Sequence, residues 1–217
     1  MAVLAVGASV FGTTVFSSPA NADGCPDVDV VFARGTDEPP GVGVIGGAFI
    51  DALRADTAPK TLTVYAVNYP ASRDYATGVA GVVDAGNHVR DMAASCPATR
   101  LVLGGYSQGA GVIALLTSDG SAAGSAALPG LPGPLPPAVA DHVAAVALFG
   151  KPSVELTNSL GMPPIAVGPL YAGRTIDLCV DGDPICTVAQ SDNIVPHLLY
   201  GVNGMAAQAA DFAARRL

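Results

Sequence analysis

The sequence predicts an α/β fold, a three-layer α/β/α sandwich with a central five-stranded parallel sheet. Two observations carry this prediction. Five short runs rich in β-branched residues are almost continuously apolar, as strands buried on both faces are. Helical stretches separate these runs, and strands that alternate with helices form right-handed crossovers, which place helices on both faces of a parallel sheet.

Each strand and helix follows from its own local pattern. The apolar runs predict strands over residues 27–33, 61–68, 100–104, 143–149 and 174–179. Helices are expected over residues 44–54, 76–94, 110–116 and 204–217. The second of these carries valines at helical spacing, and in the last we expect Met205, Ala209 and Phe212 to face the core.

Residues 119–137 consist almost wholly of Gly, Ala, Ser, Leu and Pro. Five of them are prolines, which do not fit the interior of a helix, so this segment is predicted to be a long loop. Two interpretations stay open: a tolerated insertion, or an apolar flap beside the functional site.

The charge balance excludes one class of partner. The 217 residues include 10 Lys or Arg and 18 Asp or Glu, for a net charge of −8. Nucleic-acid binding needs a basic surface, so no nucleic-acid partner is expected. Only 13% of the residues are charged and 50% are hydrophobic, which excludes a disordered chain and suits one domain with a sizeable core.

The first 22 residues carry no charged side chain and run from an apolar stretch into a small-residue site ending at Ala22. This pattern predicts a secretory signal peptide over residues 1–22, although its positively charged start is missing, so we expect the true start further upstream. Interrupting Gly and Pro residues argue against a transmembrane helix. We therefore expect a secreted protein, with cell-wall association left open, whose residues 23–217 form one domain without a membrane segment.

Four cysteines follow the predicted signal peptide: Cys25, Cys96, Cys179 and Cys186. An even number in an exported protein suggests two disulfides, and four cysteines allow three pairings. The two that lie close in sequence can close a small loop by themselves, which would leave Cys25 for Cys96. No C-x-x-C spacing occurs, so zinc and redox sites are disfavoured.

The sharpest motif is Gly105-Tyr106-Ser107-Gln108-Gly109. It follows the third predicted strand and precedes the third predicted helix. In that context G-x-S-x-G is a nucleophile elbow, a strained turn that exposes the serine hydroxyl. Glycine at both ends leaves the space that so tight a turn requires. Ser107 is therefore the candidate nucleophile.

A serine hydroxyl needs a general base, and that base needs an acid to orient it. In a fold with this elbow the three follow one another as Ser, Asp or Glu, then His. His88 precedes Ser107 and is expected to be a surface histidine on a helix. His142 opens the fourth strand, with too little chain before it to supply the acid. His197, beyond the last strand, is the predicted base.

Asp183 is the best candidate for the acid. It follows the last predicted strand and lies inside the loop that the two neighbouring cysteines would close, which would hold its carboxylate rigidly. Asp181 is a close rival, and Asp192 lies nearer the base but outside that loop. Asp177 is expected within the strand. A plain turn residue before a proline is the alternative role for Asp183.

Attack on an ester carbonyl needs hydrogen-bond donors for the oxyanion that forms. The backbone N–H of Gln108, directly after the nucleophile, is one candidate. The loop after the first strand supplies the other, where Thr36 has both a backbone N–H and a hydroxyl. Alternatively, Thr36 only caps a turn.

Further motifs span most of the chain beyond the predicted signal peptide. They are Cys25-Pro26, VVFARGT at 30–36, VYAVNYPA at 64–71, SCP at 95–97, GGYSQGA at 104–110, the strand at 143–150, DGDPIC at 181–186 and PHL at 196–198. In this order they resemble the cutinase family of α/β-hydrolases, most closely the secreted cutinase-like esterases of mycobacteria.

The resemblance implies a role for each candidate residue. It implies a triad of Ser107, Asp183 and His197, an oxyanion hole at Thr36 and Gln108, and disulfides Cys25–Cys96 and Cys179–Cys186. It also implies a small enzyme without a cofactor or a metal and without a true lid. Fungal members have Ser where Thr36 stands, which keeps the hydroxyl.

We therefore predict a secreted, monomeric serine esterase that hydrolyses carboxylic esters, such as short- or medium-chain lipid esters or polyesters, through an acyl-enzyme. An acyltransferase or thioesterase could use the same residues. A secreted binding protein without turnover is the alternative from another class, and the presence of every triad element argues against it. A peptidase is disfavoured by the resemblance.

Overall fold

The computed structural model describes residues 24–120, 128–162, 164–188 and 191–217. The predicted signal peptide lies outside these ranges, as does part of the predicted loop over residues 119–137. Among the described residues no helix is both long and apolar enough to cross a membrane.

Five parallel strands form one sheet in the order β2-β1-β3-β4-β5. The strands are β1 (Val28–Ala33), β2 (Leu62–Ala66), β3 (Arg100–Tyr106), β4 (Val143–Phe149) and β5 (Thr175–Leu178). Each lies within three residues of its predicted position. Because all five are parallel, their carboxyl ends meet at one edge of the sheet, which is where ligands bind in open α/β sheets.

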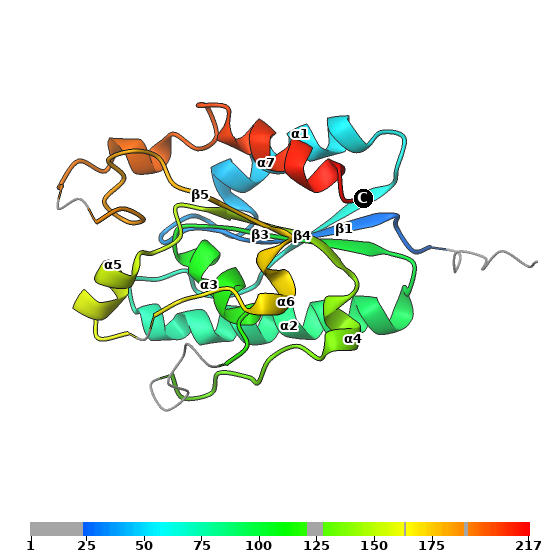
Figure 1. The fold of residues 1–217 in the computed structure, drawn as a ribbon, viewed down its shortest axis with the longest axis horizontal. Coiled ribbons are helices and arrows are strands. Elements are labelled where there is room, and N and C mark those ends of the chain that lie inside the picture. The colour runs from blue at the N-terminus through cyan, green and yellow to red at the C-terminus, as the bar shows by residue number, and fades with distance from the viewer. Residues whose placement is uncertain (1–23, 121–127, 163, 189–190) are drawn as a thin grey trace, which may run out of the picture.

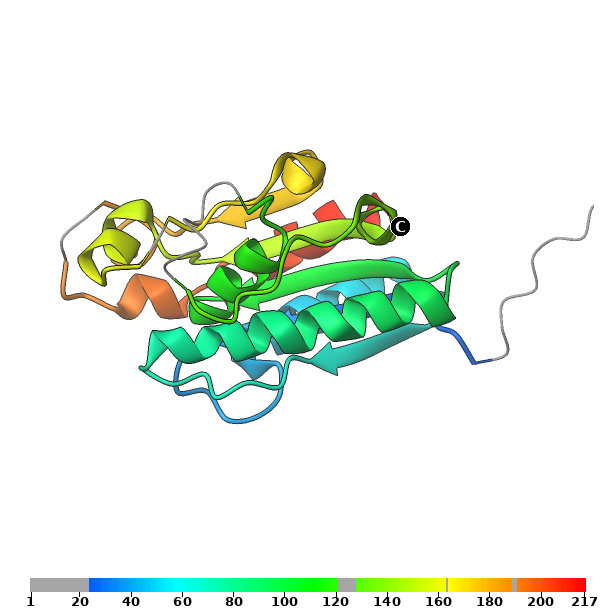
Figure 2. The same cartoon turned by 90° about the horizontal axis from the view of Figure 1, so that it is seen from below.

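Helices cover both faces of the sheet, so the predicted three-layer sandwich is confirmed (Figure 1). One face carries α1 (Gly43–Thr57) and α7 (Met205–Ala214), and the other carries α2 (Gly78–Ser95) and α3 (Gln108–Leu116). Figure 2 shows α2 running along the length of its face. These four are the helices that the sequence predicted.

Several short elements were not predicted. They are α4 (Pro137–Ala140), α5 (Val154–Ser159), α6 (Pro169–Ala172) and the 3-10 turns η1 (Tyr75–Thr77) and η2 (Val195–Leu198). Each is too short to show a helical period. In α4 and α6 a proline occupies the first turn, where its missing N–H costs nothing. Pro137 therefore begins a helix rather than ending a loop.

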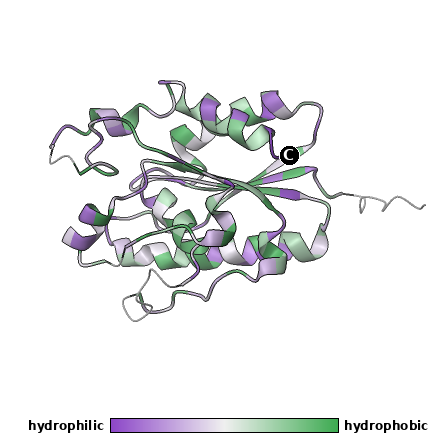
Figure 3. Ribbon diagram, viewed as in Figure 1, coloured by the Kyte–Doolittle hydropathy of each residue, from purple (hydrophilic) through white to green (hydrophobic). Residues whose placement is uncertain are grey.

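The core has two halves, one on each face of the sheet (Figure 3). In β1 the side chains alternate between them: Val28, Val30 and Phe32 pack toward α1 and α7, and Val31 and Ala33 pack toward α2 and α3. All six residues of β1 are buried, as the near-continuous apolar run predicted.

The inward face of α7 includes the three predicted residues. Ala209 is buried, and Met205 and Phe212 are partly buried and pack against the same half of the core. The fully packed positions are alanines, namely Ala206, Ala209, Ala210 and Ala213. Small side chains allow α7 to lie close against α1, so larger residues sit at the margins of the contact.

Candidate active site

Ser107 occupies the tight turn between β3 and α3. Its φ is +55° and its ψ is −119°, a conformation that an L-residue adopts only when the surrounding structure enforces it. Two features enforce it. The backbone N–H of Ser107 donates to the carbonyl of Phe149 on β4 at 2.8 Å. A Cβ on Gly105 or Gly109 would overlap backbone atoms, in the second case those of Ala33.

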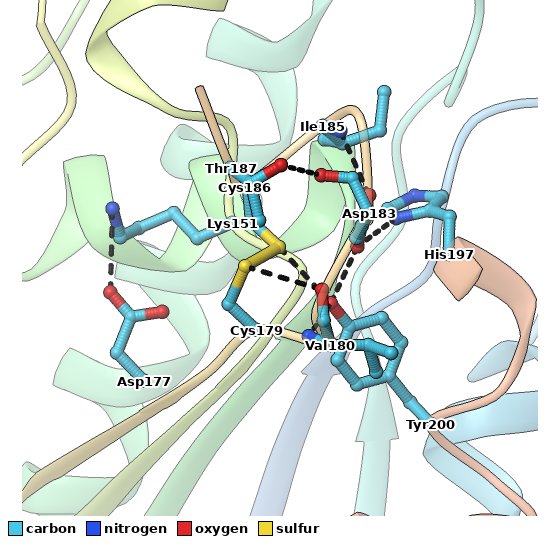
Figure 4. The surroundings of a disulfide bond; sticks show 10 residues. All are labelled: Lys151, Asp177, Cys179, Val180, Asp183, Ile185, Cys186, Thr187, His197 and Tyr200. Carbon is cyan, nitrogen blue, oxygen red and sulfur yellow. Dashed lines mark hydrogen bonds and ion pairs between the residues drawn. A yellow bond between two sulfur atoms is a disulfide. The ribbon is translucent and has the colours of Figure 1, made fainter. Parts of the chain in front are cut away.

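The side chains of Asp183 and His197 meet although 14 residues separate them. Nδ1 of His197 lies 2.7 Å from Oδ2 of Asp183, and both side chains are buried (Figure 4). Nε2 of His197, the other ring nitrogen, is buried and has no hydrogen-bond partner among the described residues. A histidine in this state has one nitrogen oriented by a carboxylate and the other available to a proton donor.

Asp183 is fixed by hydrogen bonds to both of its carboxylate oxygens. The backbone N–H of Ile185 donates to Oδ1 at 2.8 Å, and the Tyr200 hydroxyl donates to Oδ2 at 2.5 Å. Burial by itself would raise the pKa of Asp183, but the hydrogen bonds from His197, Tyr200 and Ile185 outweigh it and hold that pKa below its usual value. The carboxylate therefore stays ionised at neutral pH.

Both disulfides are present. Cys179–Cys186 closes the short loop that carries Asp183 (Figure 4), and Cys25–Cys96 links the chain before β1 to the end of α2. The first of these limits the freedom of the loop at the carboxyl end of β5.

The rival acids lie elsewhere. Asp181 and Asp192 are exposed, and Asp177 lies on β5, 3.4 Å from Nζ of Lys151. The structure thus brings Asp183, of the candidates, to His197.

The other two histidines are also apart from this group. His88 was expected at the surface, but its Nε2 lies 2.7 Å from the buried carboxylate of Asp29 and its ring stacks on Tyr65. That expectation was wrong because β1 and β2 present an acid and an aromatic ring to this side of α2. His142 is partly buried directly before β4.

Tyr106 links the elbow to the histidine. Its hydroxyl donates to the backbone carbonyl of His197 at 2.8 Å, and its ring stacks on the imidazole with centroids 4.9 Å apart. Gly150, after β4, lies against the same imidazole, since a Cβ there would come within 2.8 Å of its Cε1 atom. The ends of β3, β4 and β5 therefore converge on one site.

Thr36 and Gln108 are also brought together at this edge. The Thr36 hydroxyl lies 3.2 Å from Oε1 of Gln108, to which it donates. Gln108 is the first residue of α3, so its backbone N–H has no acceptor within the helix and stays available to an oxyanion. Because the Thr36 hydroxyl donates to the Gln108 side chain, the backbone N–H is the group of Thr36 better placed to donate to an oxyanion.

A buried arginine and a partly buried glutamate hold the Thr36 loop in place. The Arg34 guanidinium donates to the backbone carbonyls of Glu38 and Tyr69 at 2.8 and 2.7 Å. The Glu38 carboxylate accepts from the backbone N–H of Gly35 at 2.6 Å and of Val44 at 2.9 Å. These bonds tie the loop to the start of α1 and to the chain after β2.

An apolar cleft opens beside Ser107. Its polar end is formed by Thr36, Ser107 and Gln108. The rest is mostly aliphatic and includes Val112, Leu115, Leu128, Met162 and Ile165. Leu128 belongs to the segment predicted as a loop, so one residue of the Gly/Ala/Pro-rich segment does line this site.

In the described part of the chain no three His, Cys, Asp or Glu side chains gather closely enough to hold a metal ion. The cluster of Asp183, His197 and Tyr200 contains a single carboxylate and a single imidazole.

Two site residues were missed by sequence reasoning. Tyr106 and Tyr200 hold His197 and Asp183, but tyrosine is not one of the residue types expected as nucleophile, base or acid. The available signal was position alone: Tyr106 lies inside the elbow motif, and Tyr200 comes three residues after His197.

Comparison with known proteins gives one family. The family model described as Cutinase matches residues 24–217. Carboxylesterase Culp1 of Mycobacterium tuberculosis is 50% identical over 202 residues, which cover 91% of this chain and 85% of that protein. Phospholipase Culp4 of the same organism is 48% identical over 212 residues, covering 97% of this chain and 87% of that protein.

Solved structures agree with this result. Trichoderma reesei cutinase in complex with a phosphonate inhibitor is 35% identical with a TM-score of 0.66, and the match covers 88% of this chain and 76% of that one. The catalytic core of acetyl xylan esterase from the same fungus is 25% identical with a TM-score of 0.73, and the match covers 89% and 100%.

Proposed function

Because the chain belongs to the cutinase family, we propose that it is a secreted serine esterase in which Ser107 attacks the ester carbonyl, His197 is the general base and Asp183 orients His197. The observation that carries this proposal is the buried His197, with Asp183 on Nδ1 and no partner on Nε2 among the described residues. A secreted location is supported by two disulfides, which persist in oxidising compartments.

The first half of the reaction forms an acyl-enzyme. As the Ser107 oxygen attacks the carbonyl carbon, Nε2 of His197 accepts the hydroxyl proton, and the imidazolium is stabilised by the ionised Asp183. His197 then gives that proton to the departing alcohol. Water repeats the sequence on the acyl-enzyme, releases the acid and restores the Ser107 hydroxyl.

The oxyanion is proposed to bind at the start of α3. The backbone N–H groups of Gln108 and Thr36 would donate to the carbonyl oxygen as it gains charge. The first turn of α3 adds the positive end of the helix dipole. Gln108 also donates from Nε2 to the backbone carbonyl of Ser72 at 3.1 Å, which keeps its side chain out of this position.

The apolar cleft indicates the substrate class. Ser107, Gly111 and Leu115 follow one another at intervals of one helical turn, and all three line the cleft. Leu115 is therefore about 12 Å along the axis from Ser107, the length of a medium acyl chain. We propose esters of medium-chain fatty acids, with the acyl chain lying along α3 and the alcohol directed to solvent.

The test is hydrolysis of p-nitrophenyl esters from acetate to palmitate by the purified, oxidised protein, with Ser107→Ala as the matched control. Turnover that peaks at medium chain length and disappears in the variant is the expected result. An alkylphosphonate p-nitrophenyl ester should label the peptide containing Ser107 and leave the variant unlabelled. Intact protein that neither turns over nor becomes labelled would overturn the proposal.

A further inference from the structure

We propose that Tyr200 is a positioning residue that holds the Asp183 carboxylate in the orientation and charge state that His197 requires. The inference rests on the proposed esterase function. Tyr200 belongs to no part of the elbow, the base or the oxyanion hole, yet its hydroxyl lies at the centre of the hydrogen bonds around Asp183 (Figure 4).

The direction of the hydrogen bond between Tyr200 and Asp183 follows from the partners of the hydroxyl. The backbone N–H of Val180 donates to the hydroxyl oxygen at 3.1 Å. The single hydroxyl hydrogen is then left for Oδ2 of Asp183, 2.5 Å away. Oδ2 is also the oxygen that faces Nδ1 of His197 at 2.7 Å. One carboxylate oxygen therefore accepts two hydrogen bonds. The Tyr200 hydroxyl stabilises the same negative charge that orients the imidazole.

The phenol remains a donor under all conditions in which the enzyme would work. Tyr200 is fully buried. Burial first, and then the hydrogen bond with Asp183, raises the pKa of Tyr200 far above its usual value, so its proton is retained at neutral and alkaline pH.

Tyr200 also connects the two segments that carry the acid and the base. It follows η2, which carries His197, while Val180 and Cys186 belong to the loop closed by the disulfide. Its hydroxyl lies 3.2 Å from Sγ of Cys186. A Cβ on Gly150 would come within 3.0 Å of the same hydroxyl, so the chain after β4 also limits where the tyrosine can move.

Loss of the Tyr200 hydroxyl should move the pH profile in a predictable direction. Asp183 would keep two donors, His197 and Ile185, and its charge would be less shared. The coupled Asp183–His197 pair would then hold its proton more tightly. The acidic limb of the kcat/KM profile, which reports the loss of that proton, would move to higher pH.

Few other ionisable groups face this pair. Tyr106 stacks on His197, and burial raises its pKa well above its usual value, so it does not titrate in the working range. Lys151 and Asp177, near the disulfide, are paired with each other at 3.4 Å. The Glu38 carboxylate is bonded to the backbone N–H groups of Gly35 and Val44, and its charge contributes to the raised pKa of Tyr106. The carboxylate–imidazole pair thus governs the acidic limb.

The experiment compares Tyr200→Phe with Tyr171→Phe. Tyr171 is also buried, but its hydroxyl has no partner among the described residues, so the control removes the same atom without breaking a bond. For Tyr200→Phe we expect kcat to fall about tenfold with KM within about twofold. We expect its acidic limb to move upward by roughly half a pH unit to one unit. Tyr171→Phe should change neither.

A second variant covers a failure of Tyr200→Phe to fold. Site-specific 2,3-difluorotyrosine at position 200 keeps the hydroxyl and makes it a stronger donor, so the acidic limb should move to lower pH. If Tyr200→Phe folds, an unshifted acidic limb with wild-type kcat in that variant would overturn the proposal; if it does not fold, an unshifted limb in the difluorotyrosine variant would overturn it. Failure of the esterase function is a separate result, because it would appear as an inactive wild-type protein.

Discussion

The hydroxyl of Tyr106 donates to the backbone carbonyl of His197 at 2.8 Å, across 91 residues of chain. Tyr106 directly precedes Ser107, so this bond connects the turn that presents the serine to the segment that presents the histidine. The stacked rings, with centroids 4.9 Å apart, close one side of the imidazole. The positions of Ser107 and His197 are thereby coupled through a single side chain.

Tyr106→Phe should lower kcat with little change in KM. The phenylalanine ring can still stack on His197, but the bond to the carbonyl is lost, and a bond of this kind contributes about 1 kcal/mol, which corresponds to a reduction of roughly fivefold. Steady-state kinetics on a medium-chain ester measures it, with Tyr171→Phe as control. Unchanged kcat would show that stacking alone is enough.

Gly109→Ala should strongly destabilise the protein, whereas Gly47→Ala should stabilise it. A Cβ on Gly109 would overlap the backbone of Ala33 and Arg34, which cannot move without separating α3 from β1. Gly47 lies within α1 with open space around its Cα. We expect a loss of about 3 kcal/mol for the first and a gain of about 0.5–1 kcal/mol for the second. Urea unfolding measures both, and equal effects would contradict the packing argument.

Removal of one disulfide should mainly lower stability, and removal of the other should mainly lower activity. Cys25–Cys96 spans 71 residues and Cys179–Cys186 spans 7. Loop entropy predicts losses of about 4 and about 2.5 kcal/mol when each pair is replaced by serine. Only the second loop carries Asp183. We expect the smaller stability loss to accompany the larger fall in kcat, measured on both variants at a temperature where each is folded. A larger fall in kcat on loss of Cys25–Cys96 would show that the loop holds Asp183 in place without the Cys179–Cys186 disulfide.

Substitutions that narrow or widen the cleft should shift the preferred acyl-chain length in opposite directions. A side chain at Gly111 would come within 3.3 Å of Ile165, so Gly111→Val narrows the cleft and should favour shorter acyl chains by roughly tenfold in the ratio of kcat/KM values. Leu128→Ala enlarges the cleft and should favour longer ones. Leu170→Ala, on an exposed residue outside the cleft, is the control. If the first two variants shifted the chain-length preference in the same direction, the acyl chain would have to bind outside this cleft.

The fold could be predicted from the sequence because its signals are local. Near-continuous apolar runs identified all five strands, and the helices between them indicated crossovers to a parallel sheet. The short helices α4, α5 and α6 gave no such signal, since four to six residues do not complete a period. On α7 hydrophobicity correctly indicated Met205, Ala209 and Phe212, but it did not indicate the buried Ala206, Ala210 and Ala213, because alanine carries a weak hydrophobic signal.

The candidate site was predictable where a motif or chain order applied. The elbow motif pointed to Ser107, and elimination among three histidines pointed to His197. Between Asp183 and Asp181 the sequence had only a preference. The structure brings Asp183 against His197 because the backbone of the disulfide-closed loop turns one of these side chains inward and leaves the other exposed.

Local sequence patterns were enough to predict the order of strands and helices, the G-x-S-x-G motif of the elbow and the residue types available for acid and base, because each is legible within a few positions. Long-range contacts were needed to show that Tyr106 and Tyr200 hold His197 and Asp183, that the His88 ring stacks on Tyr65 beside Asp29, and that Leu128 lines the cleft. Those contacts join segments that the parallel sheet brings to one edge or one face, and sequence spacing carries no record of such distances.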